Sequence, residues 1–394
     1  MQYDFDTPVN RRGTGSLKWD VAENELPMWV ADMDFETAPE IRAALRARVE
    51  HGVFGYSVVP EAWQDAYVQW WKNRHGVIFQ QEWLIFCTGV VPAISSMVRK
   101  LTTPAENVVL MTPVYNIFFN SVLNNGRRVL ESPLRYDGAE YAVDFDDLER
   151  KLADPQTSLM ILCNPHNPIG KIWNRETLSR IGMLCRKHHV TVISDEIHCD
   201  LTAPGKEYVP FSSVSDVCRD ISITCIAPTK TFNLAGLQTA AVVVADENLR
   251  HKVWRGLNTD EVAEPNAFAV DAAVVAFTRG GAWLDALREY LHRNKEAAAS
   301  FLGTHLPQLR VVPSEATYLM WLFCGDIGEA PAVADFIRAE TGLFLSAGNP
   351  YGGNGNQFLR LNVACPRSVL QEGLERLRNG VKKFLSCDRK ETER

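Results

Sequence analysis

Short runs of apolar and β-branched residues recur between residues 84 and 245, and helix-like stretches such as RETLSRIGMLCRKHH separate them. The runs are LIFCTG, NVVLMTP, SLMILCN, VTVISDE, ISITCIAP and AAVVVAD. Strands that alternate with helices predict an α/β fold with a mainly parallel sheet. Because the runs are apolar along nearly their whole length, we expect helices to cover both faces of that sheet.

After about residue 285 the pattern changes to a long amphipathic helix, two strands and a last helix. The first three of these segments read WLDALREYLHRNKEAAASFLGTHL, ATYLMWLF and QFLRLNVA. The change predicts a smaller α+β C-terminal domain, which the N-terminal segment completes. We therefore expect a large domain at residues 47–285 and a small domain formed by residues 1–46 and 286–394.

Composition and charge narrow the class of function. A chain of 394 residues with 46% hydrophobic and 23% charged residues fits a globular protein of one or two domains. A net charge of −7 without any Lys/Arg-rich run argues against nucleic-acid binding and leaves small-molecule chemistry. The sequence lacks a stretch of membrane-span length and a signal-peptide core, so we expect a cytoplasmic protein with no membrane partner. Nine cysteines without a CxxC pair predict reduced core thiols.

The residues that end the predicted strands carry most of the chemistry, because open α/β sheets bind ligands at the carboxyl ends of their strands. In FCTGVVPAISSMV, residues Thr88, Gly89 and Val90 lead from a strand into a helix. The backbone N–H groups and the helix dipole at such a turn favour a phosphate group. A glycine that serves only the backbone geometry of the turn is the alternative.

The run VISDEIHCD places several ionisable side chains at one strand end. Glu196, His198 and Asp200 would share a face and could ligate a metal only if the strand continued that far. We expect no metal site, because the sequence has no second cluster with ligand spacing, and we interpret His198 as a structural residue. Asp195 could instead form an ion pair with a cationic heterocycle and keep a pyridine nitrogen protonated.

Two further strand ends carry an asparagine and a lysine. In LMILCNPHNPIG, Pro165 and Pro168 form a rigid turn that fixes the direction of the Asn167 amide. In APTKTFNLAGLQ, Lys230 is a single cation among small and apolar residues. A lysine is usually a solvated surface charge, but a desolvated lysine has a lowered pKa and becomes a nucleophile suited to Schiff-base chemistry.

With asparagine, aspartate and lysine at successive strand ends, the chain resembles the fold type I pyridoxal-phosphate enzymes of the class I/II aminotransferase superfamily. Within it the chain most resembles the MalY/PatB branch of cystathionine β-lyases and C–S lyases. The motifs span nearly the whole chain, and they read LPMWVADMDF (26–35), HGVFGY (51–56), PHNPIGKIW (165–173), SDEIHCD (194–200), TKTFNLAGL (229–237), TYLMW (317–321) and RLNVACPR (360–367). The resemblance implies pyridoxal 5'-phosphate (PLP) as the cofactor.

The resemblance also implies roles around the cofactor. Lys230 matches the Schiff-base lysine, Asp195 the partner of the pyridine nitrogen, and Asn167 the hydrogen-bond donor to the phenolic oxygen. Tyr115, in TPVYNIFF, matches the aromatic residue that stacks on the cofactor ring. The catalytic group implied in this way is Lys230, Asp195 and Tyr115. The residues that would hold the phosphate are Gly89, Val90 and Thr229.

Three more positions concern the substrate and the partner subunit. Arg360 matches the arginine that binds the substrate α-carboxylate, for which a planar bidentate fork is suited. Tyr56 matches a tyrosine that reaches the cofactor phosphate in the neighbouring subunit and also contacts the substrate there. This match implies a homodimer with active sites at the interface. Asp32 either lines the substrate pocket or has an ordinary N-cap or turn role.

The chain departs from the superfamily pattern at three positions. Thr229 replaces the usual serine and keeps its hydroxyl, whereas Gln238 stands where an arginine is frequent. Glutamine supplies no charge, so the phosphate would depend more on N–H groups, hydroxyls and the helix dipole. Ile169 replaces the threonine of the usual HNPTG and removes a hydroxyl.

The resemblance favours β-elimination from L-cystathionine or a related cysteine S-conjugate, giving a thiol, pyruvate and ammonia. An aminotransferase is the main alternative, because it uses the same lysine, aspartate and arginine. A PLP-binding regulator that contacts a transcription factor is another, and it would add a regulatory protein partner. Only the motifs LPMWVADMDF and HGVFGY favour elimination over transamination.

Overall fold

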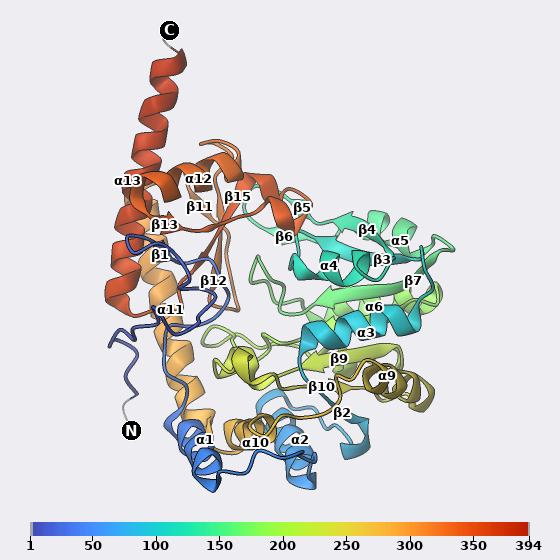
Figure 1. Ribbon diagram of the computed structural model, residues 1–394. Helices are drawn as coiled ribbons and strands as arrows, with labels where there is room; N and C mark the ends of the chain where they lie inside the picture. Colours follow the sequence, from blue (N-terminus) through green and yellow to red (C-terminus); the bar gives the residue numbers. More distant parts are fainter. Residues whose placement is uncertain (1–2, 393–394) are drawn as a thin grey trace.

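A seven-stranded sheet forms the centre of the computed structural model, which describes residues 3–392 (Figure 1). Its neighbouring strands are parallel except at β10, which runs antiparallel to both β2 and β9. This arrangement confirms the predicted mainly parallel α/β sheet. In spatial order the strands are β2 (Leu84–Cys87), β10 (Ala240–Val243), β9 (Ser222–Ile226), β8 (Thr191–Asp195), β7 (Thr157–Cys163), β3 (Asn107–Thr112) and β4 (Arg128–Pro133).

Helices cover both faces of the sheet, because successive side chains of each buried strand point to opposite faces. In β7, Leu159 and Ile161 pack in one apolar cluster, while Met160 and Leu162 pack in the cluster on the other face. The first face is covered by α3 (Val90–Leu101), α4 (Ile117–Leu123) and α9 (Glu247–Thr259), and the second by α5 (Phe145–Leu152), α6 (Arg175–Lys187) and α7 (Asp216–Asp220).

A third group of helices packs beyond β2, at the bottom of Figure 1. Its buried residues include four aromatic side chains of α2, namely Trp63, Tyr67, Trp70 and Trp71. The group consists of α1 (Pro39–His51), α2 (Glu61–His75) and α10 (Ala269–Arg279). Helices α1 and α2 both end at a histidine followed by a left-handed glycine, Gly52 or Gly76, which is a common way to stop a helix.

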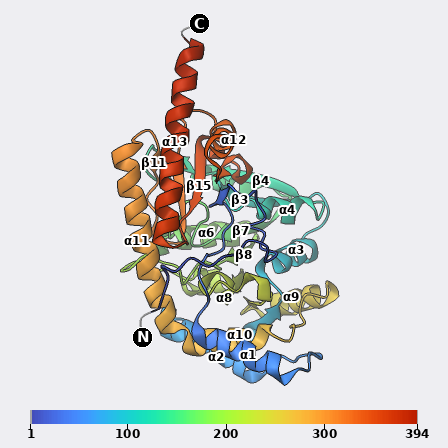
Figure 2. The same cartoon turned by 60° about the vertical axis from the view of Figure 1, so that its left-hand side comes forward.

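A smaller antiparallel sheet follows α11 (Gly281–His305), the long helix that runs beside α13 (Arg367–Thr392) (Figure 2). The N-terminal segment joins this region, because β1 (Leu26–Pro27) pairs with β13 (Leu343–Phe344). The four strands are, in spatial order, β11 (Arg310–Val311), β12 (Leu319–Phe323), β15 (Phe358–Asn362) and β14 (Ser346–Ala347). The helices packed around them are α11, α12 (Ala330–Thr341) and α13 (Arg367–Thr392).

The cysteines of the described chain are all free thiols, and all except Cys387 are buried. This confirms the expected reduced core thiols, with Cys387 as the exposed exception. Within residues 3–392, none of the helices combines the length and the apolarity that crossing a membrane requires.

Candidate active site

A cavity of about 290 Å³ opens at the carboxyl ends of the parallel strands. The ends of five strands contribute to it, namely β2, β3, β7, β8 and β9, as the alternation of strands and helices predicts. The sequence-predicted residues that line it are Gly89, Val90, Tyr115, Asn167, Asp195, Thr229 and Lys230. The fold therefore brings together residues that lie up to 141 positions apart in the sequence (230 − 89).

Lys230 projects into this cavity from α8 (Pro228–Thr231), a four-residue helix that directly follows β9. Its Nζ donates a hydrogen bond of 2.5 Å to the carbonyl oxygen of Ala31, which also accepts one of 2.8 Å from the Tyr318 hydroxyl. Burial lowers the pKa of Lys230 to about 8, against an opposing effect of the nearby Asp32 charge. A substantial fraction of this amine is consequently neutral and nucleophilic near physiological pH.

Asp195 is the last residue of β8, in the middle of the sheet, and only 4% of it is exposed. Burial raises the pKa of its carboxyl to about 7, although the backbone N–H of Ile197 donates a 3.1 Å hydrogen bond to it. Lys230 lowers this pKa slightly through its charge. A buried carboxylate facing a cavity fits a cationic ring nitrogen, because such a partner would offset the cost of desolvating the charge.

The N-terminus of α3 forms another wall of the cavity, where Gly89 is the N-cap residue. A Cβ atom at Gly89 would lie 3.2 Å from Cδ of Pro92, so a side chain there would crowd this turn. Thr88, Thr229 and Gln238 line the same cavity. The phosphate of PLP fits this wall through neutral donors and the positive end of the helix dipole, without an arginine at position 238.

Arg360 reaches the site from β15 of the smaller sheet and is 5% exposed. One of its terminal nitrogens donates a 2.8 Å hydrogen bond to the carbonyl oxygen of Trp29, and the other lies 3.4 Å from Oδ1 of Asn167. Its Nε atom is buried and has no hydrogen-bond partner among the described residues. An incompletely satisfied guanidinium beside a cavity fits a carboxylate ligand, which would accept two parallel hydrogen bonds.

Tyr115 lies on the cavity wall and packs edge-on against Phe118, with ring centroids 5.5 Å apart. Burial raises the pKa of the Tyr115 hydroxyl to about 12, so the phenol is neutral at physiological pH. A neutral aromatic ring on a cavity wall is suited to stacking against a flat heterocycle.

Besides Arg360, which lies beside the cavity, three positions named in the sequence analysis are not among its lining residues. Tyr56 is fully exposed, at 104%, in the segment between α1 and α2, so it takes no part in the site of its own chain. Asp32 is held by Arg11, whose two terminal nitrogens donate hydrogen bonds of 2.7 and 3.1 Å to its carboxylate. Ile169 is buried in the core on the other face of the sheet, where it packs rather than lining the cavity.

His198 is a cavity residue that the sequence interpretation assigned to a structural role. Strand β8 ends at Asp195, so Glu196, His198 and Asp200 follow in a turn and do not share a strand face. Burial lowers the pKa of His198 to about 3, helped by the charges of Lys230 and Arg360, and its Nδ1 atom has no hydrogen-bond partner among the described residues. A neutral imidazole therefore faces the site, and its position three residues after Asp195 was the only signal in the sequence.

A second, partly buried amine lies close enough to His198 for its charge to lower the pKa of that imidazole. Nζ of Lys295, on α11, donates hydrogen bonds of 2.8 Å to the Ser314 hydroxyl and to the Ala316 carbonyl. Burial lowers the pKa of Lys295 to about 7, because neither acceptor carries a charge.

Lys295→Met is expected to change how stability depends on pH. Between pH of about 7 and the ordinary lysine value, the unfolded chain binds the proton and the folded chain does not, so raising the pH stabilises the folded wild type. The variant lacks this contribution, so its stability relative to wild type should fall by up to about 1.4 kcal/mol per pH unit across that window. Urea unfolding curves of both proteins, recorded at the same protein concentration from pH 6 to 10, measure this difference in stability. A relative stability that does not vary with pH would contradict the burial of a titrating amine.

Comparison with known proteins agrees with this geometry. The family described as aminotransferase class I and II matches residues 24–377. The chain is 44% identical to "Cystathionine beta-lyase PatB" of Bacillus subtilis, over 95% of this chain and 99% of that protein. Among solved structures, cystalysin from Treponema denticola, described as containing pyridoxal 5'-phosphate, superposes with a TM-score of 0.94 at 32% identity, covering 98% of this chain and 100% of that chain. The PLP-bound C–S lyase of Staphylococcus hominis gives a TM-score of 0.90 at 32% identity, covering 97% and 98%.

Proposed function

Because the chain belongs to the aminotransferase class I and II family, we propose that it is a PLP-dependent carbon–sulfur β-lyase. Its substrate would be L-cystathionine or a related cysteine S-conjugate, and its products a thiol, pyruvate and ammonia. The observation that carries this proposal is the 44% identity, over nearly the full length of both chains, to a protein named as a cystathionine β-lyase. The cavity supports it, because an amine and a carboxylate line it and a guanidinium contacts the lining residue Asn167, which is the chemistry that the cofactor and an amino acid require.

PLP, when bound, supplies an aldehyde that takes up an amino group and a ring that accepts negative charge. Lys230 would hold the aldehyde covalently, and its lowered pKa makes the required neutral amine accessible. During turnover Nζ of Lys230 would accept the proton from Cα of the substrate. Asp195 would keep the ring nitrogen protonated through a buried ion pair, which places a fixed negative charge where it favours the developing carbanion.

The remaining residues would orient the substrate and the ring. Arg360 would bind the α-carboxylate, and the Asn167 amide would donate a hydrogen bond to the phenolic oxygen. Tyr115 would stack on the ring, with the α3 N-terminus and the Thr229 hydroxyl on the phosphate. When the Cβ–S bond breaks, its electron pair would leave with sulfur, which would take up the proton that Nζ of Lys230 accepted from Cα and so give the thiol. The released aminoacrylate then hydrolyses to pyruvate and ammonia.

A lyase and an aminotransferase are separated by their requirement for an acceptor. Incubation with L-cystathionine and no added keto acid should release pyruvate and homocysteine in equal amounts for many turnovers. Cystine, cysteine conjugates and common transamination donors complete the panel, scored for pyruvate, thiol and keto-acid products. Turnover that stops after one equivalent and resumes only when a keto acid is added would show that the protein is an aminotransferase.

Arg360→Ala is expected to weaken amino-acid binding with a smaller effect on kcat. The loss of two charge-assisted hydrogen bonds to the α-carboxylate should raise KM by about 10²-fold. Arg360→Lys is the matched control, since it keeps the charge but not the bidentate fork, and its KM should lie between those of the other two proteins. Steady-state kinetics with L-cystathionine measure both constants. An unchanged KM in Arg360→Ala would remove Arg360 from the carboxylate site.

We also propose a homodimer in which Tyr56 completes the phosphate site of the partner subunit. The segment that carries Tyr56 exposes neighbouring apolar side chains, Val53 at 62%, Phe54 at 55% and Val58 at 79%. Apolar exposure concentrated in one segment indicates a surface that another protein covers. Tyr56 does not line the cavity of its own chain. We therefore infer that a second copy of this chain covers the exposed segment and that Tyr56 enters the cavity of that copy.

Hybrid dimers of Tyr56→Ala and Lys230→Ala chains test this arrangement. Each variant alone should be impaired, but a hybrid dimer has one site with both residues intact if Tyr56 acts across the interface. Mixing should therefore restore activity to about half the wild-type value per hybrid dimer, from one intact site in two. Recovery no greater than the sum of the separate variants would place Tyr56 outside the partner's site.

The cellular location is proposed on the cysteines alone. Buried free thiols are typical of reducing compartments, so we propose that the enzyme works in the cytoplasm. Nothing in the described residues favours a regulatory protein partner.

A further inference from the structure

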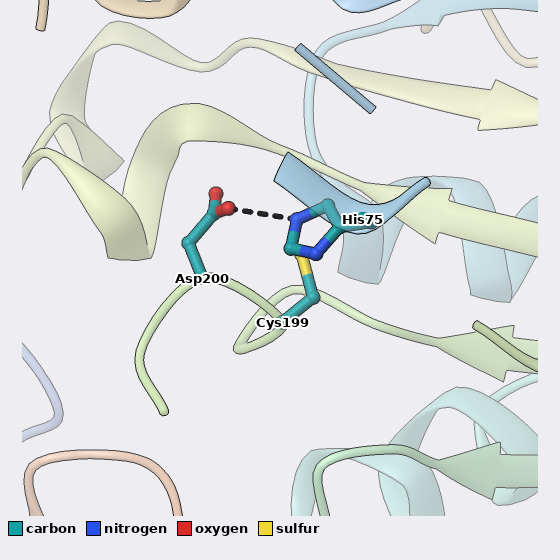
Figure 3. A group of neighbouring side chains, drawn as sticks. All are labelled: His75, Cys199 and Asp200. Carbon is teal, nitrogen blue, oxygen red and sulfur yellow. Dashed lines mark hydrogen bonds and ion pairs between the residues drawn. The ribbon is translucent and has the colours of Figure 1, made fainter. Parts of the chain in front are cut away.

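Behind the cavity, three side chains that could ligate a metal approach one another: His75, Cys199 and Asp200. Their ligand atoms lie within 4.8 Å of one another, and the side chains of His75 and Asp200 are only 9% and 1% exposed. Figure 3 shows the imidazole pointing at the Asp200 carboxylate, with the Cys199 side chain behind the ring in this view and no interaction drawn to it. The cluster joins the end of α2 to the turn that follows β8.

The carboxylate of Asp200 is the centre of this cluster. Its Oδ1 atom accepts hydrogen bonds from Nε1 of Trp70 and Nε2 of His75, and its Oδ2 atom accepts one from the Thr231 hydroxyl, all of 2.9 Å. Burial opposes the charge on Asp200, but the hydrogen bonds, with that of His75 foremost, outweigh it and lower the pKa. Asp200 is thus a fixed buried anion that ties α2 to Thr231.

Thr231 is the residue next to Lys230, and both belong to the four-residue helix α8. A single helical turn has too few internal hydrogen bonds to fix its own orientation, so its contacts must do so. On the cavity side Lys230 bonds to Ala31, and beyond the helix Asn233 donates hydrogen bonds to Met33 and Phe35. The Asp200 carboxylate adds a hydrogen bond to the Thr231 side chain, which fixes α8 through a residue next to Lys230.

We propose that Asp200 and His75 are positioning residues for Lys230: the carboxylate fixes Thr231 and hence α8, and the imidazole together with Trp70 fixes the carboxylate. The inference rests on the proposed role of Lys230. A displacement of reacting groups by about 1 Å can reduce a rate by about 10²-fold. A network that fixes the position of the Lys230 amine therefore affects the rate directly. The direct His75 to Asp200 hydrogen bond favours this role over a metal site. Burial also raises the pKa of the Cys199 thiol, whereas a metal requires the thiolate.

A cavity of about 360 Å³ beside His75 provides a specific test, because it gives a small molecule access to the imidazole position. Its lining includes His75, Cys199, Asp200 and Tyr208. In His75→Ala, free imidazole could occupy the vacated space and donate to Asp200 again. His75→Gln should retain most function without imidazole, because its amide N–H can donate from a similar position.

The experiment compares holoenzyme variants in two readouts. His75→Ala and Thr231→Val should each lower kcat for L-cystathionine by about tenfold while KM changes by less than about twofold. Without any substrate, both should shift the pH midpoint of the visible absorbance of the lysine-bound cofactor. Added imidazole should reverse both effects in His75→Ala and neither in Thr231→Val. His305→Ala is the matched control, because His305 also ends a helix but is exposed and is not among the residues that hydrogen-bond to Asp200.

Three results would overturn the proposal. His75→Ala could match His305→Ala in both readouts, or its melting temperature could fall while imidazole restores neither readout. Wild type could also take up one equivalent of Zn²⁺ that His75→Ala does not, which would make the cluster a metal site. If His75→Ala does not fold, Thr231→Val decides, since it removes only a hydroxyl group. The spectroscopic readout needs no substrate, so a failure of the lyase assignment would leave it interpretable.

Discussion

Lys230→Ala is expected to abolish turnover, with kcat lower by about 10³-fold or more. The variant loses the amine that holds the cofactor covalently and the group that accepts the Cα proton, and no other described amine lines the cavity. Pyruvate release from L-cystathionine and the yellow absorbance of the purified protein measure the two losses separately. Near wild-type activity would contradict the assignment of Lys230.

Lys230→Arg is the matched control for this result. Arginine keeps a positive charge near the Ala31 carbonyl, which Lys230 contacts in the wild type, but it stays protonated and cannot act as the nucleophile. Both variants should therefore be inactive if the reactivity of the amine matters. If Lys230→Arg retained activity while Lys230→Ala did not, the role of Lys230 would be to supply charge, and the covalent mechanism would fail.

The residues at strand ends could be predicted because their positions follow from local pattern. Each apolar run forms a buried strand, and the chain emerges at the same edge of the sheet after every parallel strand. The order of runs therefore predicts that Asn167, Asp195 and Lys230 lie at the ends of strands, and the family resemblance adds their common site. Antiparallel β10 was not predicted, because an apolar run carries no information about its direction.

Contacts between segments that are distant in the sequence could not be predicted from the pattern of residues. The Ala31 carbonyl that accepts a hydrogen bond from Lys230 lies 199 positions away from it in the sequence. The ion pair of Arg11 with Asp32 likewise depends on how the N-terminal segment folds. The pairing of His75 with Asp200 is similar, since each residue alone looks like an ordinary polar side chain. Such contacts are set by packing of the helices on the sheet, not by spacing along the chain.

The predicted domain limits stay predictions. Position 47 lies within α1 and position 285 within α11, so neither limit coincides with a loop. A change in hydrophobic pattern marks where a new sheet begins, but a helix that continues across the change conceals the boundary. Tyr56 likewise stays a prediction, because its role depends on a second copy of the chain.

Asp195→Asn is expected to lower kcat by about 10²- to 10³-fold while the protein stays folded and yellow. Asparagine has nearly the shape of aspartate and can still accept the hydrogen bond from the Ile197 N–H, so the turn after β8 should be kept. It cannot carry the charge that holds a proton on the ring nitrogen, and the free energy of the charge-separated transition state rises accordingly. Glu196→Gln, which changes the neighbouring buried acid, is the control, and it should affect kcat much less because Glu196 is bonded away from the cavity to Ser194 and Tyr208. Equal losses in the two variants would mean that Asp195 acts through folding rather than through its charge.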